Sequence, residues 1–576
     1  MAEHSGVSSP HTLLALGVLA RSALQANDRA EGKLLLTRLV QDAERGRLKQ
    51  TSGLVVRDAS ISTWIQGRSS LGVIVPGYRD LALLYAQDNE LESALRISEL
   101  ARDRSLGDWF AEQEWRSTQV PAARRAELDS LVDRIQDYDE RIAVASDIVE
   151  RVRLESERTL AVSERGSVER RLRAELHLAP PAFRPPTIDE LRAGLPAGTA
   201  LVSVLHSGET WWALVIRRGA PARFVAFADP DLGRNADAWT RRLRGDPVRA
   251  WPVGARLFLQ PTRPQGATGP YLAPDELGRR LGRNLLEPIA AVLEGEKHLV
   301  FVGDDELVGS PLQALPLGRG LALDRFELSY APSLATYARW QSRGRHPRRG
   351  RELLGIAAAE LAPVDAARTG DALLAGMQHA GAHPLPFARA EIAAIGALFP
   401  PDRTDIWTGE QASKANLRRA SKAGELLDYR YVHFAAHAWA QPDQPESSAI
   451  ALAGADAQAP GRGALTAAEL AGMRMGSDLV TLSACDTGLG RYEYGRGLLG
   501  LAYASLAAGN RAALLSLWPV ADDTTARFMQ RFYTRLRAGQ RPPAALASTQ
   551  REFRASGDRR LSDPLVWAAF VIYGGY

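Results

Sequence analysis

The strongest structural signal in this chain lies in two stretches, YVHFAAHAWA at residues 431–440 and DLVTLSACDTGLG at residues 478–490. Each begins with a short apolar run of strand length, and the second then enters a glycine-bearing turn. Further apolar runs of this kind lie at 299–302, 353–357, 450–452, 512–517 and 566–572.

Segments with helical periodicity separate most of the later runs, at 390–399, 414–420, 467–470, 497–508 and 524–538. Near-continuous apolar strands that alternate with helices predict a parallel or mixed sheet covered by helices on both faces. Residues 187–576 are therefore expected to form an α/β region, which the arginine-rich run at 343–351 divides in two.

Sites in open α/β sheets form where the carboxyl ends of the strands meet the helices. His437 follows the strand predicted at 431–435, and Cys485 follows the strand predicted at 479–482. An imidazole beside a thiol raises the thiolate fraction and can later protonate the leaving group. The 48 positions from 437 to 485 match the caspase arrangement, in which the histidine lies about 50 residues upstream of the cysteine. The pattern predicts a cysteine nucleophile activated by a histidine.

The same residues also fit other interpretations. A lone cysteine is more often a small buried hydrophobic residue than a nucleophile. His433 and His437 lie four residues apart on a strand, about 13 Å, which is too far to bind one metal ion; His433 is expected to be a strand histidine with a local hydrogen-bond partner. A serine triad is disfavoured, since no G-x-S-x-G elbow follows a strand. Neither a metal nor an organic cofactor is expected.

Composition sets the class of protein. Charged residues make up 24% of the 576 residues and hydrophobic residues 45%, which is ordinary for a globular chain. The net charge of +4 is spread along the chain, so neither nucleic acid nor a membrane surface is an expected partner. Cys485 is the only cysteine, which excludes an intramolecular disulfide and fits a reducing compartment. We expect a cytoplasmic protein.

The N-terminal part has helical spacing from Thr12 to about Glu114, interrupted at VIVPG before Tyr78. Residues 78–107 predict two helices around the polar turn 87–89. Their spacing resembles one tetratricopeptide (TPR) repeat, at the packing positions Leu81, Ala82, Tyr85, Ala94 and Ala101. A plain helical bundle explains the same spacing equally well.

A long charged helical stretch at 124–176 follows, with one apolar stripe that needs a partner, either a neighbouring domain or itself as a hairpin. A proline cluster ends it. We therefore expect four parts: a TPR-like helical region at 1–120, a helical connector with a proline-rich linker at 121–186, a non-catalytic half of the α/β region at 187–345 and a catalytic half at 346–576.

The α/β region resembles the CHAT family, caspase-like cysteine peptidases that commonly follow TPR repeats. The matching pieces include LPFARAEIAAIGALF, YVHFAAHAWA, GALTAAELAGMRMGSDLVTLSACDTGLG, GRGLLGLAYASLAAGNRAALLSLWPVADD and SDPLVWAAFVIYGGY. Upstream pieces such as HLVFVGDDELVGSPLQALPL extend the resemblance to about residues 187–576. The resemblance implies a caspase-like α/β fold.

By position, the resemblance implies that Cys485 is the nucleophile and His437 the general acid and base. The backbone amides of Cys485 and Ala438 would form the oxyanion hole. The family usually has glycine where this chain has Ala438, and alanine keeps the amide while restricting the backbone.

The resemblance extends to a substrate pocket. In the related separase peptidases, an acidic residue at the place of Asp522 receives a basic side chain of the substrate, and a bidentate carboxylate contact suits arginine. The alternative is that Asp522 or Asp523 caps the helix that starts at Thr524, since aspartate is among the best N-cap residues.

These observations indicate a regulated cysteine endopeptidase that cleaves a protein substrate after a basic residue, while the helical repeats bind a partner or sensor. Relatives with identified substrates resemble initiators of bacterial defence or cell death. The main alternative is a scaffold with weak or no turnover that acts through protein–protein interaction. A cysteine hydrolase or acyltransferase acting on a small molecule is a third hypothesis.

Overall fold

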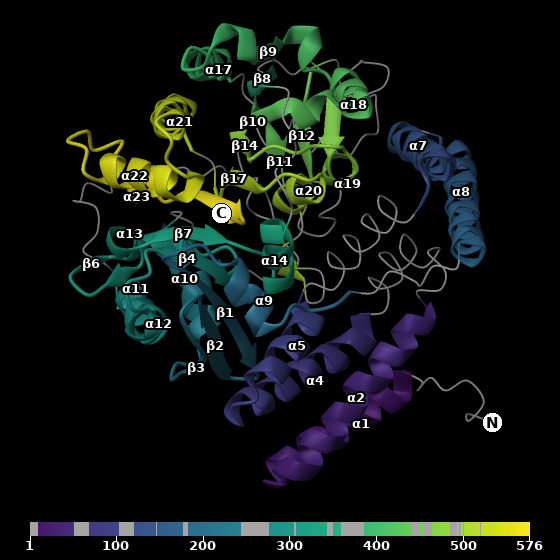
Figure 1. Ribbon diagram of the computed structural model, residues 1–576, viewed down its shortest axis with the longest axis vertical. Coiled ribbons are helices and arrows are strands. Elements are labelled where there is room, and N and C mark those ends of the chain that lie inside the picture. Colours follow the sequence, from purple (N-terminus) through teal and green to yellow (C-terminus); the bar gives the residue numbers. More distant parts are fainter. Residues whose placement is uncertain are drawn as a thin grey trace. The chain divides into compact units, whose positions relative to one another are not determined.

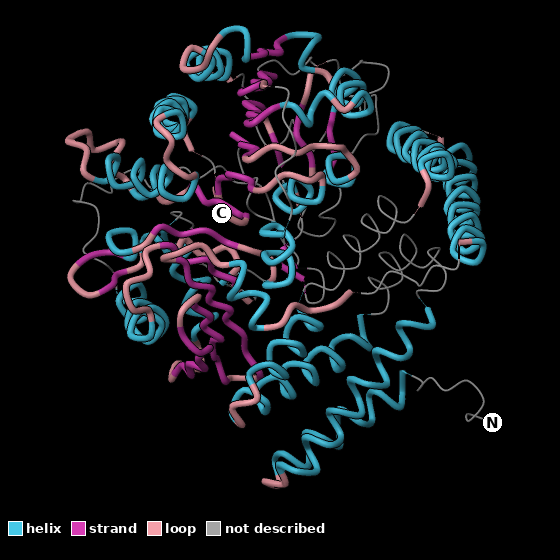
Figure 2. The backbone as a smooth tube through the Cα atoms, in the orientation of Figure 1, coloured by secondary structure: helices cyan, strands magenta, loops and turns pink. Residues whose placement is uncertain are grey.

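The structure is a computed structural model, shown in Figures 1 and 2. It describes residues 10–50, 68–102, 120–145, 147–176, 183–243, 276–304, 307–342, 350–358, 385–439, 448–453, 463–483, 492–493, 497–498, 500–518 and 520–576. The chain forms two compact units. The first consists mainly of Met1–Ile188 with the hairpin tip Leu205–Thr210, and the second contains most of the remainder.

In its described residues, the N-terminal segment of the first unit is helical: α1 (Pro10–Gln25), α2 (Arg29–Gln50), α4 (Arg68–Gln87), α5 (Leu91–Arg102), α7 (Ala122–Val144) and α8 (Ile148–Glu175). The helices α4 and α5 pack as a pair around the turn predicted at 87–89, with Leu81 and Ala94 buried between them. Asn89 has φ = 61°, a left-handed conformation that asparagine tolerates better than most residues. The predicted helix pair is confirmed.

The interruption expected before Tyr78 is wrong, because α4 continues through Pro76. A proline inside a helix removes one backbone hydrogen bond and strains the preceding turn. Tertiary packing compensates here, since Tyr78 is buried and Gly77 lies so close to α2 that an added Cβ would be 3.2 Å from Leu39.

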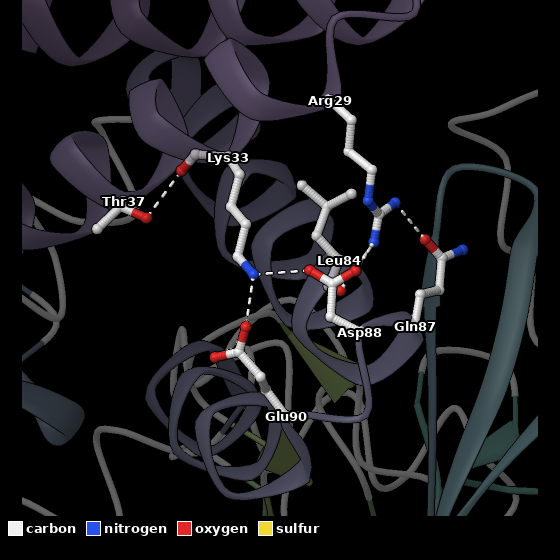
Figure 3. Close-up of polar contacts among 7 residues, drawn as sticks. All are labelled: Arg29, Lys33, Thr37, Leu84, Gln87, Asp88 and Glu90. Carbon is white, nitrogen blue, oxygen red and sulfur yellow. Dashed lines mark hydrogen bonds and ion pairs between the residues drawn. The ribbon is translucent and has the colours of Figure 1, made fainter.

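Charged side chains connect α2 to the turn between α4 and α5 (Figure 3). The Lys33 ammonium donates to Asp88 at 2.7 Å and to Glu90 at 2.8 Å. Arg29 donates to the other Asp88 oxygen at 2.6 Å and to Gln87 at 2.7 Å. Asp88 is therefore shared by two cations from one helix, which fixes the turn against it.

The charged stretch after the helix pair folds back on itself as a hairpin of α7 and α8. Part of its apolar stripe is buried in two clusters, formed by Val120, Leu128, Leu131, Val168 and Leu172 and by Ile135, Ala161 and Val162. The stripe was also expected to include Val149 and Val152, but both side chains are exposed. Asp147 caps α8 by accepting the Val149 amide at 3.1 Å. Of the two partners expected for the stripe, the helix hairpin is the one observed.

The second unit is built on one eleven-stranded sheet. In spatial order its strands are β3 (Ala220–Phe227), β2 (Thr210–Arg217), β1 (Thr199–Ser207), β4 (His298–Val302), β7 (Glu327–Tyr330), β18 (Phe570–Gly574), β17 (Ala512–Ser516), β14 (Leu479–Ser483), β10 (Tyr429–Ala436), β8 (Arg351–Ala358) and β9 (Thr404–Thr408). Short strands β11 (Ala438–Trp439), β12 (Ala449–Ala451) and β13 (Ala464–Thr466) form a second sheet; β5 (Pro316–Leu317) pairs with β6 (Gly320–Leu321), and β15 (Tyr492–Glu493) with β16 (Gly497–Leu498).

Helices flank this sheet: α9 (Ile188–Gly194), α10 (Leu232–Leu243), α11 (Glu276–Leu281), α12 (Glu287–Val292), α13 (Ala322–Arg325), α14 (Leu334–Ser342), α17 (Ala388–Gly396), α18 (Lys414–Ala423), α19 (Ala467–Ala471), α20 (Leu501–Ala507), α21 (Asp522–Arg537), α22 (Pro542–Arg554) and α23 (Pro564–Trp567). Around β8, β10 and β14, Figure 1 shows α17 and α21 on one side and α18, α19 and α20 on the other.

The sheet contains two blocks of parallel strands. One block is β9, β8, β10, β14 and β17, and the other is β18, β7, β4 and β1. They meet at β17 and β18, which are antiparallel. The expected α/β fold, with a parallel or mixed sheet flanked by helices and preceded by a helical region, is confirmed, and the sheet is mixed.

Two predicted elements start four residues later than expected. The strand expected at 566–572 starts only at Phe570, because Asp563 accepts the Leu565 amide at 2.9 Å and caps the short helix α23. The helix expected at 497–508 starts at Leu501, since residues 497–498 pair as β16. In both places an apolar run was shared between two elements.

Candidate active site

The strand that leads to His437 lies beside the strand that leads to Cys485. The strands β10 and β14 are parallel neighbours, with Tyr431 opposite Leu479 and Ala435 opposite Ser483. His437 follows β10 directly. Cys485, two positions after Ser483 in the sequence, lies outside the described residues. The described part of the chain thus brings the two strand ends together at one edge, as the sequence predicts.

The backbone after His437 is fixed by the small sheet of β11, β12 and β13. The His437 carbonyl accepts the Ala451 amide at 2.8 Å, and Ala438 lies opposite Ile450 in the antiparallel pair. In an antiparallel ladder, hydrogen-bonded and non-hydrogen-bonded pairs alternate. Because His437 is hydrogen bonded to Ala451, the next pair, Ala438 and Ile450, is not hydrogen bonded, and the amide of Ala438 points away from β12. This amide is therefore not used in the β11–β12 ladder, as an oxyanion donor requires.

His433 is fully buried on β10 and hydrogen bonded through both ring nitrogens. Its Nε2 lies 2.8 Å from Oε1 of Glu391, and its Nδ1 lies 3.2 Å from the hydroxyl of Tyr533. The Tyr533 hydroxyl lies 2.8 Å from Oγ1 of Thr481 on β14. The expected hydrogen-bonded strand histidine is confirmed. Its partners come from α17, α21 and β14, and no sequence pattern had pointed to them.

Asp522 is the first residue of α21, but it does not cap that helix. The N-cap is Ala521, whose side chain makes no capping bond. Asp522 instead accepts the backbone amide of Phe387, the N-cap of α17, at 2.8 Å. Asp523 pairs with Arg560 at 2.7 Å. The capping interpretation of both aspartates is wrong for α21, because their carboxylates are directed to other segments.

Electrostatics favour a cation beside Asp522. Burial raises the pKa of its carboxyl, and the negative charges of Glu391 and Asp523 raise it further, while the Phe387 amide opposes the shift. No basic side chain within the described ranges forms an ion pair with Asp522. A bound cation would relieve the unfavourable surroundings of this charge.

The described part of the chain holds neither a metal-binding cluster nor a helix suited to a membrane. No three histidine, cysteine, aspartate or glutamate side chains there lie close enough together to hold a metal ion. No described helix combines the length and the apolar character that crossing a bilayer requires.

The fold and the paired strand ends define a mixed α/β protein with a candidate Cys–His site at one sheet edge. A family model, the CHAT domain, matches residues 275–575, slightly more than half of the chain. The chain belongs to the CHAT domain family.

Two curated relatives are named as tetratricopeptide repeat proteins. The chain is 36% identical over 110 residues to Tetratricopeptide repeat protein 28 of Mus musculus and 32% identical over 110 residues to its Homo sapiens counterpart. Each match covers 19% of this chain and 4% of the relative, so the chain spans only a small part of their length.

Among solved structures, the chain is similar to the separase–securin complex of Saccharomyces cerevisiae, with 10% identity, a TM-score of 0.40, and coverage of 92% of this chain and 40% of that chain. It is also similar to the Arg-specific cysteine proteinase gingipain R, with 10% identity, a TM-score of 0.31, and coverage of 49% and 63%.

Proposed function

We propose that this protein is a cysteine endopeptidase in which Cys485 is the nucleophile and His437 the general acid and base. The observation that carries the proposal is the parallel register of β10 and β14, which places Ala435 opposite Ser483 two residues before each candidate. Membership of the CHAT domain family supports it.

The reaction would pass through a thioester. The Cys485 thiolate attacks the scissile carbonyl, and the amides of Cys485 and Ala438 donate to the oxyanion that forms. His437 protonates the leaving amine and then removes a proton from the water that hydrolyses the thioester. Free cysteine and imidazole are regenerated.

Asp522 is proposed to select a basic residue just before the scissile bond. The support is its half-buried carboxylate, which makes one hydrogen bond to a backbone amide and no described ion pair. A guanidinium could use the remaining oxygen and neutralise the charge.

The N-terminal helices are proposed to bind a regulatory protein partner or sensor, supported by the TPR-like pair α4–α5 and the similarity to TPR-containing relatives. We further propose a cytoplasmic location, consistent with a single cysteine, and a role in defence or cell death.

The dyad is tested with a thiol-reactive peptidyl electrophile that carries arginine next to the reactive group. We expect stoichiometric labelling of the wild type, none of Cys485→Ala, and at least about 100-fold slower labelling of His437→Ala, because the thiolate loses its partner. If the wild type stays unlabelled even when its binding partner is present, the alternative of a scaffold with weak or no turnover is favoured. The reagent applied to folded Cys485→Ala controls for labelling elsewhere.

The pocket is tested with Asp522→Asn, which keeps an acceptor for the Phe387 amide but loses the charge. We expect labelling by the arginine reagent to slow by about 10- to 100-fold and labelling by a norleucine analogue to change little. Asp523→Asn is the matched control. Equal effects of the two variants, or equal slowing of both reagents, would remove Asp522 from substrate selection.

A further inference from the structure

Four buried polar side chains cross the region beneath the candidate active site. Glu391 comes from α17, His433 from β10, Tyr533 from α21 and Thr481 from β14, and each is at most 2% exposed. Successive members lie 2.8, 3.2 and 2.8 Å apart. We call this set the buried relay.

A single assignment of donors and acceptors satisfies every hydrogen bond of the buried relay. A carboxylate only accepts, so Nε2 of His433 donates to Glu391. With a neutral imidazole, Nδ1 then accepts from the Tyr533 hydroxyl, and the Tyr533 oxygen accepts from Thr481. Chains of this kind are stronger than isolated bonds in a low-dielectric interior, and removing one member leaves others unsatisfied.

The buried relay spans the two strands that matter for the site. His433 and Thr481 are register partners on β10 and β14. His437 and Cys485 each come four residues later in the sequence. The Tyr533 hydroxyl, on α21, contacts both His433 and Thr481 and so links the two strands four residues before His437 and Cys485.

Aromatic packing holds the bridging ring in place. The Tyr533 ring lies 5.4 Å from the His433 ring and 6.0 Å edge-to-face from Tyr431, both on β10. The hydroxyl therefore has little freedom to move without moving the strand. The mutual hydrogen bonds of these buried polar groups offset their desolvation cost and, unlike apolar contacts, also fix the directions in which the side chains lie.

The helix that holds Glu391 also contacts the proposed substrate carboxylate. The Phe387 carbonyl accepts the Glu391 amide at 2.7 Å, and the Phe387 amide donates to Asp522. The first turn of α17 thus lies between Asp522 and the buried relay.

We propose that Glu391, His433, Tyr533 and Thr481 are positioning residues that fix the ends of β10 and β14 relative to each other, and thereby align His437 with Cys485. The proposal rests on the proposed function and deepens it. The residues act through the strands and never touch the substrate.

The test uses Tyr533→Phe and Thr481→Val, which remove one hydroxyl each and keep the shape of the side chain. Tyr573→Phe is the matched control, because its buried hydroxyl donates to the Val308 carbonyl at 2.9 Å elsewhere in the same sheet. For each protein, the rate of alkylation by iodoacetamide is measured against pH, together with the melting temperature. Cys485 is the only thiol, so the rate reports on that residue alone.

We expect the wild type to alkylate with an apparent thiol pKa below the ordinary value of about 8.5. Tyr533→Phe and Thr481→Val should move the profile toward that value and slow alkylation at neutral pH by about 10-fold. Tyr573→Phe should lower the melting temperature about as much as Tyr533→Phe does, but it should leave the pH profile of alkylation unchanged.

The outcomes separate the relay from the dyad. If the wild type shows the ordinary thiol pKa and His437→Ala does not change it, both the proposed function and the relay proposal are overturned. If His437→Ala moves the profile and both relay variants leave it at the wild-type position, the relay proposal fails alone. Should Tyr533→Phe not fold, Thr481→Val decides.

Discussion

His298 shows how burial sets the charge of a single side chain. It lies on β4, is 1% exposed, and its Nε2 is 2.8 Å from Oγ of Ser329. Burial lowers the pKa of His298 to about 3, and the positive charge of Arg541 adds to the shift. The imidazole is therefore neutral in the folded protein at any pH at which the protein would work.

His298 should make the folded state acid-sensitive. Its pKa in the folded protein lies below the ordinary histidine value of 6.5, so the unfolded chain binds a proton that the folded chain does not. The contribution of the neutral His298 to the free energy of unfolding is therefore fully present above about pH 6.5 and is lost progressively as the pH drops toward 3. At about pH 4.5 the loss is on the order of 2–3 kcal/mol.

This pH dependence is measured by urea unfolding of the wild type and His298→Gln at pH 7 and at about pH 4.5. The variant is expected to be less stable at pH 7, because it loses the shape of the imidazole, and the gap should narrow at the lower pH. A gap of constant size at both pH values would contradict the assignment.

At the scale of elements, Asp88 connects α2 to the turn between α4 and α5. Hydrogen bonds from Lys33 and Arg29 lower the pKa of its carboxyl. The side chain is 33% exposed, so water screens each pair and the network as a whole has a modest effect.

Asp88→Ala is therefore expected to destabilise the protein by about 0.5–1 kcal/mol in low salt and by less in 1 M NaCl. Thermal unfolding followed by circular dichroism measures the change. The control is Asp189→Ala, because the Asp189 carboxylate is 90% exposed and its ion pair among the described residues is with the nearby Arg192. A loss that does not depend on salt would show that the turn geometry, rather than charge, is responsible.

At the scale of the whole α/β unit, the last strand of the chain joins the two parallel blocks. The strand β18 is antiparallel to β17 and parallel to β7. Buried side-chain amides hold the chain at and just before its start: Gln313 donates to the Ala568 carbonyl at 2.8 Å and Gln550 to the Phe570 carbonyl at 3.0 Å. The end of β18 passes very close to β17, since a Cβ on Gly574 would lie 2.4 Å from the Arg511 carbonyl oxygen.

Gly574→Ala should therefore destabilise the unit by about 2–4 kcal/mol, because its φ of 145° is unfavourable for alanine and the backbone of β17 cannot move aside. Gly557→Ala is the control, since an added Cβ there meets nothing within 4 Å. Differential scanning calorimetry of both variants measures the effect. Equal melting temperatures for the two variants would contradict this account of the junction.

Local pattern was enough to predict several strands of the large sheet and several of the helices beside them. Apolar runs of strand length identified β4, β8, β10, β14 and β17, and helical periodicity identified α17, α18, α19 and α21, because each depends on residues close in sequence. The sequence also predicted His437 and Cys485 as the candidate residues, because each follows a predicted strand.

Tertiary structure alone decided the order of the strands, the insertion of β18 between β17 and β7, the passage of α4 through Pro76, and the partners of His433 and Asp522. Each depends on contacts between residues distant in sequence: Asp522 accepts an amide 135 positions away, and His433 bonds to residues 42 and 100 positions away. Backbone propensity acts over a few residues, whereas the burial of polar groups is satisfied by whatever the fold brings near, so these contacts exist only once the sheet has assembled.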